Sequence, residues 1–217
     1  MSDTRRVVVI GGGPAAHRFV EAMLARGTAG MSITVITEEH YLPYDRVNLG
    51  KALLHEVDLS LAESAFWEDE RVGLLVGSRV VRLDLPSREV HTADGTVIPF
   101  DELVLATGSD ASRLPFPGAD HALVYRTLDD VHRLKRTIAN LGRKFGRKPA
   151  VVVIGGGLLG IEAAAGALEL GAESAVVNRS GWLMNAQLDE GAGQALGRLI
   201  ADKGFADQNL VDLCHIR

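Results

Sequence analysis

Two glycine-rich stretches in this 217-residue chain have the composition of phosphate-binding turns. VVVIGGGPAA spans residues 7–16, and VVVIGGGLLG spans residues 151–160. In each stretch, four apolar residues that predict a buried strand are followed by three glycines and then by a helix pattern. Such a turn presents free backbone N–H groups and the positive end of a helix dipole to a ligand. A pyrophosphate group, which is an anion with many acceptor oxygens, binds to such N–H donors and to such a positive helix end.

The spacing within each turn suits a dinucleotide. The first glycine permits the tight turn, the third lets a pyrophosphate approach the backbone, and a later small residue lets helix and strand pack closely. One such copy would be equally consistent with an ordinary turn, but two indicate one flavin site and one nicotinamide site. The residues expected to bind the cofactors here are Gly11, Gly13, Pro14, Ala15 and Ala16 in the first copy, and Gly155, Gly157, Leu158, Leu159 and Gly160 in the second.

Acidic residues follow the next strand of the first copy. Residues 33–36 read as a buried strand, and Glu38 and Glu39 stand at its carboxyl end. In dinucleotide-binding folds an acid at this place accepts hydrogen bonds from a ribose hydroxyl. We assign that role to Glu38, and the alternative is a solvated loop carboxylate.

The corresponding strand of the second copy, residues 175–177, is followed by Asn178 and Arg179. NAD sites usually carry an acid here, whereas NADP sites lack the acid and add an arginine. We therefore expect NADPH to be at least tolerated, with a preference for it over NADH where Arg179 pairs with the 2′-phosphate. The alternative is a loop that makes no contact with the cofactor.

The composition restricts the class of protein. The chain is 47% hydrophobic and 24% charged, so it can form a sizeable core, and its net charge of −5 gives no sign of nucleic-acid binding. No apolar run approaches the ~20 residues of a membrane span. The N-terminus leads almost directly into a strand and leaves no room for a signal peptide, so we expect a cytoplasmic protein. The single cysteine, Cys214, excludes an internal disulfide, and we expect no metal site.

The remaining pattern predicts an α/β fold with two consecutive Rossmann-like units. Helices are expected over residues 14–27 and 129–141, with a shorter one over 61–69. A further helix is expected to begin in the second glycine turn, residues 155–160, and to run through residue 170. Asp94-Gly95 lies between two strand-like runs, which predicts a hairpin. We place an FAD-binding unit at residues 1–115 and an NAD(P)-binding unit at residues 116–217.

Three further segments carry a family resemblance. EEHYLPYDRVNLGKAL (38–53), LVLATG (103–108) and LMNAQLDEGAG (183–193) resemble FAD-dependent pyridine nucleotide reductases related to ferredoxin reductases. They are most similar to the N-terminal part of the large subunit of NAD(P)H-dependent nitrite reductases. The resemblance implies a β-meander inserted in the first unit. It also implies that the chain is incomplete at its C-terminus, after about Phe205.

The resemblance also assigns roles to residues. It implies that Arg46 lies along the FAD, that Lys51 lies near the reactive edge of the flavin, and that Glu162 lies near the nicotinamide. Lys51 and Glu162 are therefore the expected catalytic residues, and Gly50 departs from the serine that is usual before the lysine. The other residues implied to contact FAD are Ala106, Thr107 and Gly108.

The implied function is hydride transfer from NAD(P)H to FAD, with onward delivery of electrons to an acceptor outside this chain. This activity would be the electron-input part of a nitrite reductase. Two alternatives are a reductase of the ferredoxin or rubredoxin type and a non-catalytic nucleotide-binding fragment.

Overall fold

The computed structural model describes residues 4–27, 29–113, 115 and 117–202. The chain divides into two compact units, one of residues 1–46 and 58–110 and the other of residues 47–57 and 111–217. The sequence placed the boundary near residue 115 and assigned 47–57 to the first unit. Residues 47–57 instead pack within the second unit, where Leu53 lies against Gly166. The predicted tail beyond Phe205, with Cys214, lies outside the described residues.

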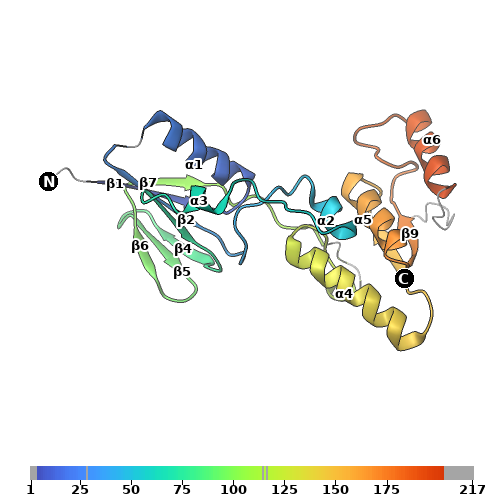
Figure 1. The fold of residues 1–217 in the computed structure, drawn as a ribbon. Coiled ribbons are helices and arrows are strands. Elements are labelled where there is room, and N and C mark those ends of the chain that lie inside the picture. The colour runs from blue at the N-terminus through green and yellow to red at the C-terminus, as the bar shows by residue number, and fades with distance from the viewer. Residues whose placement is uncertain (1–3, 28, 114, 116, 203–217) are drawn as a thin grey trace. The chain divides into compact units, whose positions relative to one another are not determined.

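A parallel sheet of order β3-β2-β1-β7 forms the centre of the first unit. Its inward side chains are β-branched, including Val7, Val9 and Val35, and they pack against Ala16 and Val20 of α1. Figure 1 shows α1 lying along this sheet. The bounds are β1 (Arg5–Ile10), α1 (Pro14–Arg26), β2 (Met31–Ile36), β3 (Val72–Leu75) and β7 (Glu102–Leu105).

A three-stranded antiparallel meander is inserted between β3 and β7, as the resemblance implied. It consists of β4 (Val80–Asp84), β5 (Glu89–Thr92) and β6 (Val97–Pro99). Asp94-Gly95 makes the predicted hairpin turn, with Gly95 at a φ of +90°. The helix expected over residues 61–69 is shorter, and α3 covers only Ser64–Trp67.

The second unit is built around two parallel strands, β8 (Ala150–Ile154) and β9 (Glu173–Val177). Helix α4 (Leu128–Phe145) extends beyond both ends of its predicted span, and Thr127 caps it in a capping box with Asp130. Helix α5 covers Leu158–Glu169, close to the prediction. Two helices that the sequence analysis did not assign are α2 (Leu49–Leu54) and α6 (Glu190–Ala201). A single 3-10 turn covers Ala119–His121.

His17 is a buried histidine in the first unit. The ring of His17 on α1 lies 5.1 Å from the ring of Phe66 and 5.9 Å from that of Trp67, and its Nδ1 has no hydrogen-bond partner among the described residues. Burial lowers the pKa of His17 below its ordinary 6.5, with Glu21 opposing the shift and Arg18 adding to it. The folded state therefore favours the neutral imidazole.

We expect the free energy of unfolding to fall as the pH drops below about 6.5, because the unfolded chain then takes up a proton that folded His17 resists. The stabilisation is fully present above the unfolded pKa. Replacing His17 by phenylalanine should make the urea midpoint fall less between pH 7 and pH 5. Equal falls in the wild type and in His17→Phe would contradict this assignment.

No helix among the residues that the structure describes is long and apolar enough to cross a membrane.

Candidate functional site

The three glycines of the first turn differ in what a side chain would meet. A Cβ at Gly11, whose φ is +118°, would overlap the carbonyl oxygen of Ala106, and one at Gly12 would lie 2.5 Å from the Thr37 hydroxyl. A Cβ at Gly13 would meet only Arg46 Nε, at 3.7 Å. Close packing thus explains the first two glycines, whereas Gly13 leaves open space at the start of α1. A phosphate group requires open space at that point.

The segment after β7 reaches this turn. The Ala106 amide donates to the Ile10 carbonyl at 2.8 Å, so the chain leaves β7 directly against Gly11. Thr107 and Gly108 follow and are exposed, and Gly108 has a φ of +69°. The structure therefore brings the Ala-Thr-Gly segment next to the first glycine turn, although almost a hundred residues separate the two in sequence.

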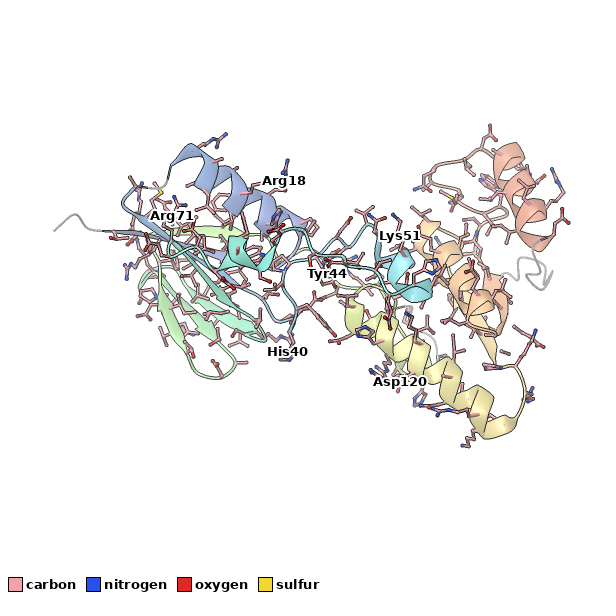
Figure 2. All side chains as sticks on the ribbon, viewed as in Figure 1. Arg18, His40, Tyr44, Lys51, Arg71 and Asp120 are labelled. Carbon is pink, nitrogen blue, oxygen red and sulfur yellow. The ribbon has the colours of Figure 1, made fainter. Side chains whose placement is uncertain are left out.

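Arg46 is held beside Gly13 by two side chains. Its guanidinium forms an ion pair with Glu39, and its Cζ lies 5.0 Å from the centroid of the Tyr44 ring. The Tyr44 hydroxyl donates to Glu39 Oε2 at 2.7 Å, which fixes the carboxylate in turn. Tyr44, labelled in Figure 2, was not among the predicted site residues. The only sequence signal for it was its place two residues before the arginine. A fixed cation next to a helix N-terminus attracts an anion.

The two adjacent glutamates have different surroundings. The Glu39 side chain is 14% exposed and is engaged by Arg46 and Tyr44. The Glu38 side chain is 61% exposed and is 3.6 Å from Arg79 Nε. The Glu38 carboxylate is therefore the more accessible of the two, and its contact with a ribose stays a prediction. Glu39 is better described as the anchor of Arg46.

The second turn repeats the open position. Gly155 has the same φ of +118° as Gly11, and a Cβ at Gly157 would meet nothing within 4 Å. A Cβ at Gly160 would overlap the Gly155 carbonyl oxygen, so this glycine allows the close packing that the sequence predicted. Leu158 and Leu159 are 56% and 48% exposed at the start of α5.

The helices that begin at the two turns share another feature. Their N-cap residues, Gly13 and Gly157, make no side-chain cap, whereas Thr127 and Asp189 cap α4 and α6. Uncapped first-turn amides are available to an external anion. Both turns therefore have the features of dinucleotide-binding sites.

The Asn178 side chain forms hydrogen bonds within the protein, so it was wrongly expected to contact the cofactor. Its Oδ1 accepts from the Gly156 amide at 3.2 Å, and its Nδ2 donates to the carbonyls of Ser180 and Trp182 at 3.2 and 2.8 Å. The residue is 8% exposed. Asn178 thus braces the glycine turn against the loop after β9, and its amide N–H groups are not available to a ribose. Arg179 is exposed and forms no ion pair with another described residue, so any selectivity at this place falls to Arg179.

The two expected catalytic residues lie on helices that pack together in the second unit. Lys51 is exposed on α2 (Figure 2), and Glu162 is one turn into α5. Helix α2 sits close to α5 because Leu53 occupies the space that a side chain at Gly166 would fill. On α4, Lys135 donates to the Ala52 carbonyl of α2 at 2.6 Å, so α2 is also bonded to α4. Lys51 and Glu162 do not form an ion pair in the described part of the chain.

Known proteins share the sequence pattern and the fold of this chain. The family model described as pyridine nucleotide-disulphide oxidoreductase matches residues 5–206. The nitrite reductase (NADH) large subunit of Escherichia coli is 36% identical over 204 residues, which are 92% of this chain and 23% of that protein. The ferredoxin–NAD(+) reductase component of the anthranilate 1,2-dioxygenase system of Burkholderia cepacia is 35% identical over 93% of this chain and 49% of its own length.

Among solved structures, a ferredoxin reductase from Rhodopseudomonas palustris superposes with a TM-score of 0.82 at 30% identity, over 95% of this chain and 50% of that one. The α/β fold with its parallel sheet is the fold of such reductases. The family and these relatives depend on FAD and NAD(P)H. The chain spans about a quarter of the nitrite reductase subunit and about half of each of the two reductases.

Proposed function

Because the chain belongs to the pyridine nucleotide-disulphide oxidoreductase family, we propose that it binds FAD at its first glycine turn and NAD(P)H at its second. The observation that carries the proposal is the pair of open positions, Gly13 and Gly157, each at an uncapped helix N-terminus. The residues at the first turn fit a pyrophosphate, because Arg46 adds a fixed positive charge there.

Bound FAD would supply the redox chemistry, taking up two electrons from the reduced nucleotide. The residues of this chain bind and orient. The first turn and Arg46 hold the flavin pyrophosphate, and Glu38 accepts from its ribose. The second turn holds the nicotinamide nucleotide, and the roles of Glu162 near the nicotinamide and Lys51 near the flavin are carried over from the family resemblance. The electrons then leave for an acceptor outside the chain. The single cysteine provides no dithiol pair for disulfide reduction.

The part played by Arg46 gives a direct test of the first site. Replacing Arg46 by alanine should weaken FAD binding by about tenfold to a hundredfold, the worth of a charge-assisted contact to phosphate. Titration of the apo chain with FAD, followed by flavin fluorescence, measures this. Arg18→Ala is the control, because Arg18 is an exposed arginine on α1, the helix that begins at the first turn, and pairs with Glu21. Equal affinities of both variants for FAD would remove Arg46 from the site.

We assign selectivity between NADPH and NADH to Arg179. Its exposed guanidinium follows β9 and can pair with a 2′-phosphate, so NADPH should bind at least as tightly as NADH. Arg179→Ala should lower NADPH affinity about tenfold and leave NADH nearly unchanged. The test replaces Arg179 and not Asn178, because replacing Asn178 would remove its hydrogen bond to the glycine turn. A wild type that binds only NADH, with Arg179→Ala neutral for both nucleotides, would refute this.

We propose that the electrons serve nitrite reduction, and that this chain is the electron-input part of a nitrite reductase large subunit. The supporting observations are the LMNAQLDEGAG segment and the likeness to the E. coli subunit. A ferredoxin-type reductase is the second candidate, favoured by the equal likeness to the Burkholderia cepacia component and by the Rhodopseudomonas palustris structure. Reduction of added ferredoxin by the NAD(P)H-reduced protein would favour the second candidate.

A further inference from the structure

Glu39 places a negative charge beside the position where the first turn is open to a phosphate. Its carboxylate forms an ion pair with Arg46, and the two side chains are 14% and 27% exposed. The carboxylate has two opposed effects on an incoming phosphate. Its charge repels the phosphate, whereas its bond to Arg46 holds the cation in place before the ligand arrives. An arginine side chain that had to be ordered on binding would bind the phosphate more weakly.

The Glu39 carboxylate is itself fixed from two directions. The Glu39 amide donates to Thr37 Oγ1 at 3.3 Å, and the Glu39 carbonyl accepts from the Gly77 amide at 3.0 Å, so the backbone is tied at the end of β2. The Tyr44 hydroxyl (Figure 2) donates to Glu39 Oε2 at 2.7 Å. Tyr44 is 4% exposed, and its ring meets the Tyr41 ring edge-on with 6.3 Å between centroids. The ion pair with Arg46 is therefore built on a rigid support.

Arg46 lies closer than Glu39 to the open position of the turn. Arg46 Nε is 3.7 Å from the Cβ position of Gly13, and no atom of Glu39 lies within 4 Å of that point. Because the Coulomb energy falls with distance, a phosphate there is attracted by Arg46 more strongly than it is repelled by Glu39. The benefit of a fixed Arg46 then exceeds the repulsion from the carboxylate.

We propose that Glu39 is a positioning residue that strengthens FAD binding, although its charge has the same sign as that of the pyrophosphate. It acts through Arg46, and Tyr44 fixes its carboxylate. The proposal rests on the proposed FAD site and deepens it. Glu39 itself makes no contact with the cofactor, in contrast to the role that we assign to Glu38.

Two substitutions at Glu39 separate its hydrogen bonds from its charge. Glu39→Gln removes the charge and keeps an oxygen that accepts from Arg46, whereas Glu39→Ala removes both. We expect Glu39→Ala to bind FAD about five- to tenfold more weakly than wild type, and Glu39→Gln to bind it within about twofold of wild type. If the charge of Glu39 alone mattered, both variants would bind FAD more tightly than wild type.

Double variants show whether the effect passes through Arg46. In an Arg46→Ala background, Glu39→Ala should no longer weaken FAD binding, because the carboxylate then has no cation to hold. Tyr44→Phe keeps the ring, whose centroid lies 5.0 Å from Arg46 Cζ, and removes only the hydroxyl. It should weaken FAD binding about two- to threefold, and not at all in the Arg46→Ala background. If a thermal melt shows that Glu39→Ala is unfolded, Tyr44→Phe decides the question.

Titration of each apo protein with FAD, followed by flavin fluorescence, gives the affinities. Equal or tighter binding by a folded Glu39→Ala would overturn the role of Glu39 and leave the FAD site and Arg46 standing. Equal affinities of Glu39→Gln and Glu39→Ala, or losses from Glu39→Ala or Tyr44→Phe that persist without Arg46, would also overturn that role alone. Failure of wild type to bind FAD would overturn the first site together with the inference.

Discussion

Replacing Gly13 by valine is expected to abolish FAD binding while the chain stays folded. The space beside Gly13 holds no protein atom nearer to the Cβ position than Arg46 Nε, so the valine side chain meets no rigid neighbour. It would instead occupy the place where the pyrophosphate approaches the backbone. Flavin fluorescence on titration with FAD measures binding, and circular dichroism with a thermal melt measures folding.

Gly11→Val is the matched control at the same turn. Its Cβ would overlap the Ala106 carbonyl, and its φ of +118° is strained for any residue with a side chain. We therefore expect Gly11→Val to lose the folded first unit as well as FAD. Full flavin occupancy in Gly13→Val would place the FAD elsewhere.

Asn178→Asp is expected to destabilise the second unit more than Asn178→Ala does. Alanine removes three buried hydrogen bonds, which should lower the free energy of unfolding by about 2–4 kcal/mol. Aspartate keeps the shape, but it turns an acceptor towards the Ser180 and Trp182 carbonyls, which are themselves acceptors, and it buries a charge. We expect about 1–3 kcal/mol of further loss from this repulsion.

Urea denaturation of the three proteins at pH 7 gives the order directly. Arg179→Ala, one residue along and exposed, is the control and should unfold like wild type. Equal stability of Asn178→Asp and wild type would show that Asn178 does not brace the glycine turn.

The strand, glycine turn and helix at each site could be predicted from the sequence. Strand, glycine turn and helix are adjacent in the chain, so four β-branched residues and three glycines were enough to place β1, α1, β8 and α5. The hairpin at Asp94-Gly95 was predictable for the same reason. Each depends on residues within a few positions of one another.

Features that depend on long-range packing could not be predicted in this way. Residues 47–57 belong to the second unit because Leu53 meets Gly166, more than a hundred residues away. Asn178 suited a cofactor contact until its bond to the Gly156 amide was seen. The family resemblance placed Lys51 and Glu162 in the site without showing that α2 and α5 pack together.

The central claim is that this chain brings NAD(P)H and FAD together for hydride transfer. The most direct test is to load the purified chain with FAD, remove oxygen, and add NADPH or NADH while recording the visible spectrum. Bound oxidised flavin absorbs near ~450 nm and loses this band on reduction. We predict that the band disappears after addition of one equivalent of nucleotide, and that Gly157→Val, which should retain FAD, does not bleach. A wild type that binds both FAD and the nucleotide and still keeps its band would contradict the account.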